Sequence, residues 1–131
     1  ESLTRSLCSL KDVMFIGKIP DVENVLHKAD LFLLTSEKES FGLSALEAMA
    51  SSVPVISSNA GGLPELVEEG ISGFTCEIGD INEMSNKALE ILDKKNIKNF
   101  KENAFKIANK YDINKVLPEY ITFYKNILTQ F

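Results

Sequence analysis

The sequence predicts an α/β fold in which helices flank a parallel sheet, and three observations support this. Short apolar runs at residues 31–35, 54–57 and 74–76 each suit a buried strand. Stretches with apolar residues at helical spacing alternate with these runs. Strands that alternate with helices join into a parallel sheet, because each helix carries the chain back over the sheet. At 131 residues and 44% hydrophobic content, the chain can bury the core of one domain.

The N-terminal part contains elements that precede the first of these strands. Residues 1–10 have the apolar spacing of the end of an amphipathic helix. Residues 13–16 predict a short buried strand that is closed by Gly17. Asp21 is a candidate N-cap for a helix that begins at Val22.

The middle of the chain predicts a strand–helix–strand unit. A helix over residues 42–51 joins the strands at 31–35 and 54–57. A loop at residues 59–65 then leads into a short helix, in whose first turn Pro64 is acceptable.

Glycines and an aspartate mark the elements that follow. Gly70 and Gly73 bracket a turn into the last strand, and Asp80 is a candidate cap for the next helix. Two further helices are predicted near residues 98–110 and 113–129, where they would brace the sheet. Their aromatic residues are spaced as helix core: Phe100, Phe105, Tyr111, Tyr120, Phe123 and Tyr124.

The composition argues against several classes of function. A net charge of −5 disfavours binding to a nucleic-acid backbone, though not to a nucleotide, whose phosphates are held by local dipoles. Cys8 and Cys76 form no metal or redox motif, which indicates a reducing, cytoplasmic setting. No apolar run reaches membrane-spanning length, and the N-terminus has no signal-peptide pattern. Because the chain lacks an initiator methionine, we expect it to be a piece of a longer protein.

Two carboxylates around a helix start are the most informative feature of the sequence. Glu39 lies in the loop after the strand at 31–35, and Glu47 lies about a turn and a half into the following helix. Between them, the free N–H groups near Gly42 form a positive pole that suits an anion. Acids that bind hydroxyl groups on either side of a phosphate cradle suit a nucleotide-sugar.

The segment from Glu39 to Glu47 resembles the Glu-x7-Glu signature of the family 4 glycosyltransferases (group 1), which are retaining enzymes with the GT-B fold. Its context is similar too, since Pro54-Val55-Ile56 and Gly61-Gly62-x-Pro-Glu65 follow in the family's order. The resemblance implies a Rossmann-like sheet from the C-terminal, nucleotide-sugar-binding domain of a GT-B enzyme. Within the family, residues 36–43 and 75–80 resemble the members of the bacillithiol pathway, which join N-acetylglucosamine from its UDP-sugar to L-malate.

The resemblance assigns a role to each part of the motif. Glu47 would accept hydrogen bonds from the two ribose hydroxyls of UDP, because a carboxylate offers only acceptors. Glu39, the expected catalytic residue, would hold a hydroxyl of the donor sugar near the anomeric carbon. Backbone N–H groups would bind the sugar or the distal phosphate at Phe41, Gly42 and Leu43.

Two neighbouring segments complete the implied donor site. The backbone around Lys18 and Ile19 would hold the uracil, and Gly61 and Gly62 would wall the donor pocket at the carboxyl ends of the strands. The residues by themselves leave another role open for the two glycines, which also suit a turn with positive φ that touches no ligand.

The family's chemistry implies no metal and no cofactor. The acceptor hydroxyl attacks from the face that the β-phosphate leaves, so the anomeric configuration is retained. The implied partners are a UDP-sugar donor and a small-molecule acceptor. Dipoles and cations stabilise the departing charge, and the family's Arg and Lys are expected upstream. Arg5, Lys11 and Lys18 do not lie in the matching context.

The resemblance covers only the latter part of the second domain of such an enzyme. Two earlier strands are expected between those at 13–16 and 31–35, in the family order 3-2-1-4-5-6. Without them a strand edge is unpaired, which favours association. We therefore expect the segment alone to be inactive, and either to repack, to self-associate or to form the ordered part of a longer chain.

Two other functions remain open from the sequence. One is a nucleotide-binding or regulatory module that keeps the fold without transfer. The other is a hydrolase or epimerase that uses Glu39 and Glu47 directly, which needs one carboxylate with a raised pKa. The helix start between the acids favours diphosphate binding instead. His27 is predicted to be a surface residue, and Cys76 a small core residue.

Overall fold

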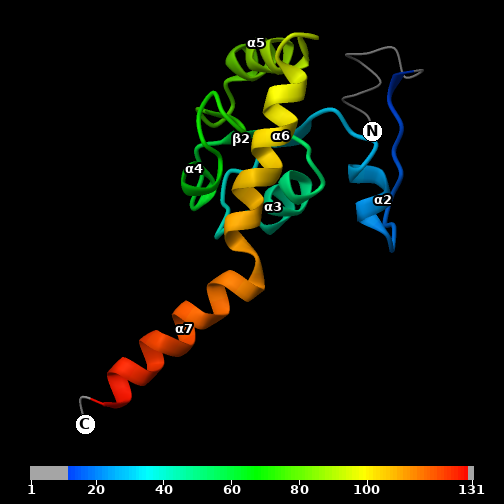
Figure 1. The fold of residues 1–131 in the computed structure, drawn as a ribbon. Coiled ribbons are helices and arrows are strands. Elements are labelled where there is room, and N and C mark those ends of the chain that lie inside the picture. Colours follow the sequence, from blue (N-terminus) through cyan, green and yellow to red (C-terminus); the bar gives the residue numbers. More distant parts are fainter. Residues whose placement is uncertain (1–11, 130–131) are drawn as a thin grey trace.

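The computed structural model describes residues 12–129, which contain a three-stranded parallel sheet (Figure 1). The strands, in spatial order, are β1 (Phe32–Leu34), β2 (Val55–Ser58) and β3 (Gly73–Cys76). In the central strand, Ile56 lies opposite Leu33 on one side and opposite Phe74 on the other. The predicted α/β class is therefore confirmed.

Helices follow each strand and continue to the C-terminus. They are α2 (Val22–Leu26), α3 (Leu43–Ala50), α4 (Leu63–Leu66), α5 (Ile81–Leu92), α6 (Ile97–Ala108), the 3-10 turn η2 (Asn109–Tyr111) and α7 (Ile113–Leu128). The helices predicted over residues 42–51, after Asp80, and near 98–110 and 113–129 are confirmed.

Aspartates begin several of these helices. Asp80 caps α5, since its Oδ1 accepts a hydrogen bond from the N–H of Glu83 at 2.8 Å. Asp112 caps α7 in the same way, through the N–H of Asn114 at 2.8 Å. Asp21 stands at the N-cap position of α2, but its side chain makes no capping hydrogen bond.

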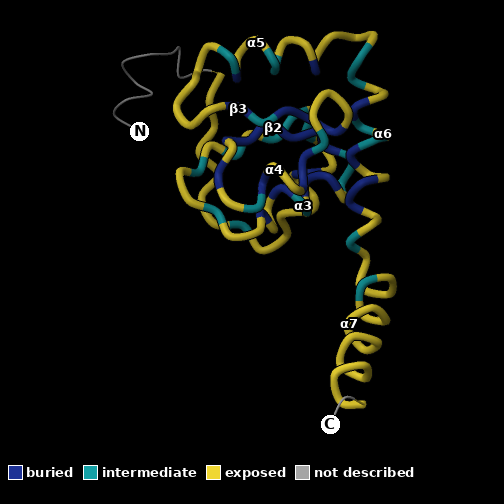
Figure 2. The backbone as a smooth tube through the Cα atoms, turned by 90° about the vertical axis from the view of Figure 1, so that its left-hand side faces the viewer, coloured by how far each residue is buried: buried dark blue, intermediate teal, exposed yellow. Residues whose placement is uncertain are grey.

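The central strand carries hydrophobic side chains into both faces of the sheet. Val55 packs in a cluster with α3, α4 and the C-terminal half of α6, whereas Ile56 packs with α5 and with Phe100 of α6. All of β2 is buried, and Figure 2 shows it among the dark blue segments at the centre of the molecule. The sheet is therefore a layer between two helical layers.

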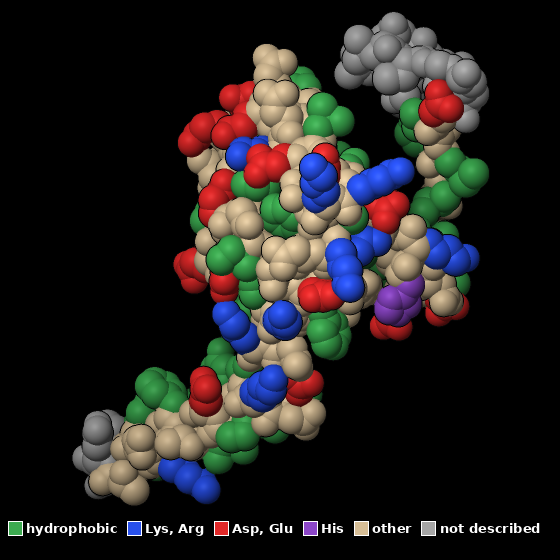
Figure 3. All heavy atoms as spheres, turned by 45° about the horizontal axis from the view of Figure 1, so that its top comes forward, with side chains coloured by type: hydrophobic (Ala, Val, Ile, Leu, Met, Phe, Trp, Pro, Cys, Tyr) green, Lys and Arg blue, Asp and Glu red, His purple; other side chains and the backbone are tan. Residues whose placement is uncertain are grey.

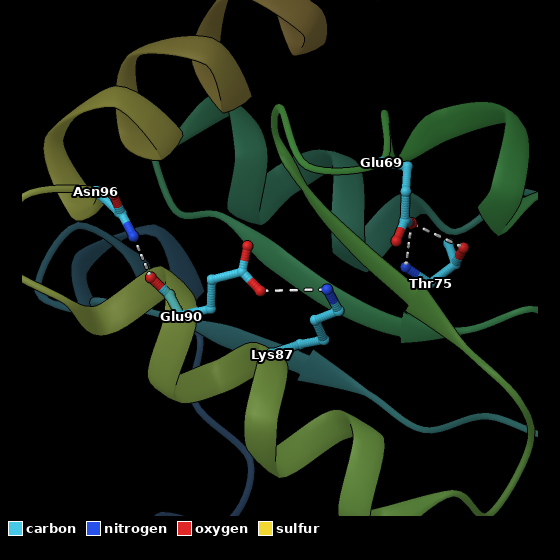
Figure 4. A network of polar contacts seen from close by, with 5 residues as sticks. All are labelled: Glu69, Thr75, Lys87, Glu90 and Asn96. Atoms are coloured by element: carbon cyan, nitrogen blue, oxygen red, sulfur yellow. Dashed lines mark hydrogen bonds and ion pairs between the residues drawn. The ribbon is translucent and has the colours of Figure 1, made fainter.

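Polar contacts fasten β3 and α5 at the surface (Figure 4). Glu69 Oε2 accepts hydrogen bonds from the backbone N–H of Thr75 at 3.0 Å and from its hydroxyl at 3.3 Å. Lys87 pairs with Glu90 at 3.1 Å and lies 4.1 Å from the centre of the Phe74 ring. Such exposed contacts are each worth about 1 kcal/mol or less, so the apolar clusters carry most of the stability.

Two predictions about strands are wrong. Residues 13–16 form no strand, and their side chains are exposed. A strand needs a hydrogen-bonding neighbour, and β1, at the edge of the described sheet, does not pair with them. For the same reason β1 is an edge strand rather than a buried one, and its Leu33 is 55% exposed. The helix predicted over residues 1–10 lies outside the described residues.

The prediction that both C-terminal helices brace the sheet holds for α6 and is wrong for α7. Helix α6 packs on α3, whereas α7 projects away from the body (Figures 1 and 2). No residue of α7 is buried, so Tyr120, Phe123 and Tyr124 are exposed instead of core. Phe100 is buried as predicted, while Phe105 is 49% exposed.

The surface shows no single charged patch on the face drawn in Figure 3, where acidic and basic side chains are interspersed and hydrophobic side chains lie along α7. None of the helices within residues 12–129 is both long enough and apolar enough to cross a membrane.

Candidate functional site

The loops that follow the three strands meet at one edge of the sheet, because carboxyl ends of parallel strands share an edge. The hydroxyl of Ser58, the last residue of β2, donates a hydrogen bond to the carbonyl oxygen of Ser36, which lies after β1. The N–H of Asn59 donates to the carbonyl oxygen of Cys76 at 2.9 Å, and its Nδ2 donates to Glu77 Oε1 at 2.7 Å. Hydrogen bonds among the strand ends and the loops that follow them therefore define this edge.

The 39–43 loop leads from this edge into α3. Gly42 is the N-cap residue, buried and left-handed with φ +93°, a conformation that favours glycine. No described residue accepts a hydrogen bond from the N–H groups of Phe41, Gly42 or Leu43. Glu39 Oε1 accepts one from the N–H of Ser40 at 3.1 Å. A helix start with free donors thus follows Glu39, as predicted, and the Glu39 residue is half-buried.

The 61–62 turn presses directly against the 39–43 loop. A Cβ built on Gly61 would lie 1.5 Å from the carbonyl oxygen of Glu39, and one built on Gly62 would lie 2.8 Å from that of Ser40. Leu63 lies beneath Gly42, with its Cδ2 2.6 Å from where a Cβ would be. The structure therefore brings together the two glycine-containing segments that the sequence singled out.

Glu47, in α3, does not face the 61–62 turn but faces α2. Its side chain is exposed and lines a pocket of about 290 Å³ together with Val22, Glu23, His27 and Ser51. Glu39 does not line this pocket and lies against the 61–62 turn instead. The two motif acids therefore have different surroundings. His27 is a surface residue, as predicted.

Lys18 and Ile19 are the predicted site residues that the structure does not join to the others. They lie in the irregular stretch before α2, at the right of Figure 1. No hydrogen bond or ion pair within residues 12–129 links them to Glu39 or Glu47. The 39–43 loop and the 61–62 turn are therefore the assembled part of the site.

Phe41 has an aromatic partner that the sequence pattern did not indicate. Its ring meets the ring of Tyr111 edge to face, with centroids 5.8 Å apart. The Tyr111 hydroxyl also donates to the carbonyl oxygen of Glu65, at a long 3.4 Å. Since Tyr111 lies far along the chain, between α6 and α7, no local motif signals this contact.

Cys76, the last residue of β3, also lies at this edge. It is a buried free thiol, as predicted for a core residue. Burial, followed by the nearby carboxylate of Glu83, raises the pKa of the Cys76 thiol. The thiol is therefore a poor nucleophile here. Within residues 12–129, no group of three His, Cys, Asp or Glu side chains lies close enough to hold a metal ion.

Known proteins are similar to this chain in sequence and in fold. The profile of the family described as "Glycosyl transferases group 1" matches residues 1–107. N-acetyl-alpha-D-glucosaminyl L-malate synthase of Bacillus anthracis is 40% identical over 118 residues, which cover 88% of this chain and 31% of that protein. The chain thus spans about a third of the length of this relative.

Solved structures of related proteins are similar to this fold. The Anabaena protein Alr3699/HepE in complex with UDP matches with a TM-score of 0.81 at 30% identity, over 92% of this chain and 35% of that one. The C-terminal domain of a glycosyl transferase group 1 family protein (LpcC) from Francisella tularensis matches with a TM-score of 0.67 at 30% identity, over 77% and 53%. The structural neighbours are GT-B glycosyltransferases, and this chain belongs to the group 1 glycosyltransferases.

Proposed function

We propose that this chain is the donor-binding part of the C-terminal domain of a retaining glycosyltransferase, with UDP-N-acetylglucosamine as donor and L-malate as acceptor. The observation that carries the proposal is the 39–43 loop. Its free N–H groups lie at the start of α3, between Glu39 and Glu47 in the sequence. The similarity to the L-malate synthase supports this choice of donor and acceptor.

Each part of a UDP-sugar has a partner of suitable chemistry. The diphosphate carries negative charge, which suits the positive start of α3 and its unpaired N–H groups. Glu47 is exposed and can accept hydrogen bonds from a vicinal diol such as the ribose. Glu39, beside the same N–H groups, takes the sugar hydroxyls in this proposal. The backbone at Lys18 and Ile19 is the proposed contact for the uracil.

The proposed reaction breaks the bond between the anomeric carbon and the β-phosphate oxygen and forms one between that carbon and the acceptor oxygen. The acceptor's proton leaves with the phosphate, so the products are UDP and the glycoside. Dipoles at the start of α3 stabilise the charge on the departing phosphate. Upstream cations and an acceptor domain complete the catalyst in this proposal, and a cytoplasmic location remains a prediction from the cysteine pattern.

The test is release of UDP from UDP-N-acetylglucosamine by the intact protein that carries this chain, with and without L-malate. We expect release to depend on L-malate, and the product to keep the α configuration by its anomeric proton coupling in NMR. Release that needs a different acceptor would reject the L-malate assignment. UDP binding without any transfer would favour the alternative of a nucleotide-binding module.

Matched variants test the roles of the two acids. Glu39→Gln should lower kcat, and Glu47→Gln should raise the Kd of UDP by about tenfold, because a charge-assisted hydrogen bond is lost. Glu37→Gln is the control, since Glu37 is an exposed acid two residues before Glu39 and has no proposed contact. An equal effect of all three variants would point to net charge rather than to the site.

A further inference from the structure

Tyr111 contacts both halves of the candidate site from the junction of α6 and α7. Its ring packs on Phe41 with the ring planes at 78°, which is an edge-to-face arrangement. Its hydroxyl reaches the carbonyl oxygen of Glu65 in α4. Phe41 belongs to the 39–43 loop and Glu65 follows the 61–62 turn. One half-buried side chain therefore joins the two segments of the site.

The 39–43 loop is held on two sides by different means. On one side, Gly61 and Gly62 lie against the main chain of Glu39 and Ser40. On the other side, the Phe41 ring is the anchor, because the N–H groups of Phe41, Gly42 and Leu43 have no acceptor among residues 12–129. Phe41 is 42% exposed, and its ring contacts the Tyr111 ring.

We propose that Tyr111 is a positioning residue of the donor site, whose ring holds Phe41 and thereby orients the backbone N–H groups of residues 41–43. This inference rests on the proposed function. Donors that are already oriented bind an anion without first ordering a mobile loop, so the ring contact contributes to donor affinity. The ring carries the effect rather than the hydroxyl, because the hydrogen bond to Glu65 is long.

The effect is specific to one part of the ligand. The loop contacts the sugar and the distal phosphate in the proposed site, whereas Glu47 contacts the ribose. Loss of the Tyr111 ring therefore weakens the binding of UDP and leaves unchanged the binding of UMP, which lacks the distal phosphate. A general loss of folding would weaken both.

The test measures the Kd of UDP and of UMP by isothermal titration calorimetry on the intact protein. Tyr111→Leu should raise the Kd of UDP about three- to tenfold, the effect of losing one aromatic pair, and leave that of UMP unchanged. Tyr111→Phe keeps the ring and should bind UDP as the wild type does. Phe105→Leu is the matched control: it removes an aromatic ring from the same groove of about 330 Å³ that Tyr111 lines, without touching the Phe41 pair.

The possible outcomes separate this inference from the proposed function. If Tyr111→Leu binds UDP normally, or loses UDP and UMP equally, the positioning role is overturned and the proposed function stands. If the wild type binds neither nucleotide, the proposed function fails and the positioning role fails with it. If Tyr111→Leu does not fold, Phe41→Leu removes the same pair from the other side and must show the selective loss of UDP.

Discussion

Gly61 approaches Glu39 so closely that no side chain fits between them. A Cβ on Gly61 would lie 1.5 Å from the Glu39 carbonyl oxygen and 2.7 Å from its carbonyl carbon. Both are backbone atoms, so no change of rotamer can make room. The turn after β2 and the loop after β1 can therefore lie together only if residue 61 is glycine.

Gly61→Ala should lower the free energy of unfolding by about 3 kcal/mol or more, because it adds a backbone clash to the cost of a left-handed residue at φ +55°. Gly79→Ala is the matched control. Gly79 also has positive φ, at +83°, but open space around it, so the expected loss is about 1 kcal/mol. Urea unfolding measures both, and equal losses would mean that the close approach carries no cost.

Ser57→Ala should leave the free energy of unfolding unchanged or raise it by up to about 1 kcal/mol, because the buried Ser57 Oγ has no hydrogen-bond partner among the described residues. Its neighbour Ser58 is equally buried, but its hydroxyl bonds to the Ser36 carbonyl. Ser58→Ala should therefore lower the free energy by about 1 kcal/mol. Urea unfolding of the pair compares the two hydroxyls, and a clear loss in Ser57→Ala would reveal an unseen partner.

Asp80→Ala should lower the free energy of unfolding by about 1 kcal/mol, since its carboxylate satisfies the N–H of Glu83 at the start of α5. Asp21→Ala should change it far less, because the Asp21 side chain makes no such bond at the start of α2. Circular dichroism during thermal unfolding can measure the difference. Similar losses in both variants would argue against capping as the cause.

Cys76 should react slowly with iodoacetamide in the folded protein, because burial raises the pKa of its thiol and thiolate is the reactive form. The rate should rise with pH in a higher range than that of a free cysteine. A Cys8→Ser background isolates Cys76, and the same protein in urea is the control. Fast alkylation near neutral pH in the folded state would contradict the burial of this thiol.

The same shift predicts a pH dependence of stability. The folded protein holds the Cys76 proton more tightly than the unfolded chain does, since the folded pKa is the higher one. Stability from this group is therefore complete below about pH 9 and falls as the pH rises through the folded pKa. Urea unfolding across alkaline pH measures the loss, and Cys76→Ala should remove this part of the pH dependence.

Local patterns were enough to predict most of the elements and the motif. The alternation of apolar runs and amphipathic stretches predicted β1, β2, β3 and the helices that follow them, and Asp80 was found as a cap from its place before a helical pattern. The motif from Glu39 to Glu47 pointed to the family that the comparisons show. Such features depend on residues that are close together in the chain, so they can be predicted from a single sequence.

Contacts between distant residues were decided by the tertiary structure. Residues 13–16 have the composition of a strand, yet a strand exists only beside a hydrogen-bonding partner. The aromatic residues of α7 have core spacing, yet nothing in the described chain covers them. The sequence by itself predicted the segment from Glu39 to Glu47 and the Gly61-Gly62 pair as parts of a candidate site. Only the tertiary structure showed that Gly61 and Tyr111 hold its loop, because both contacts join segments whose separation leaves no local pattern.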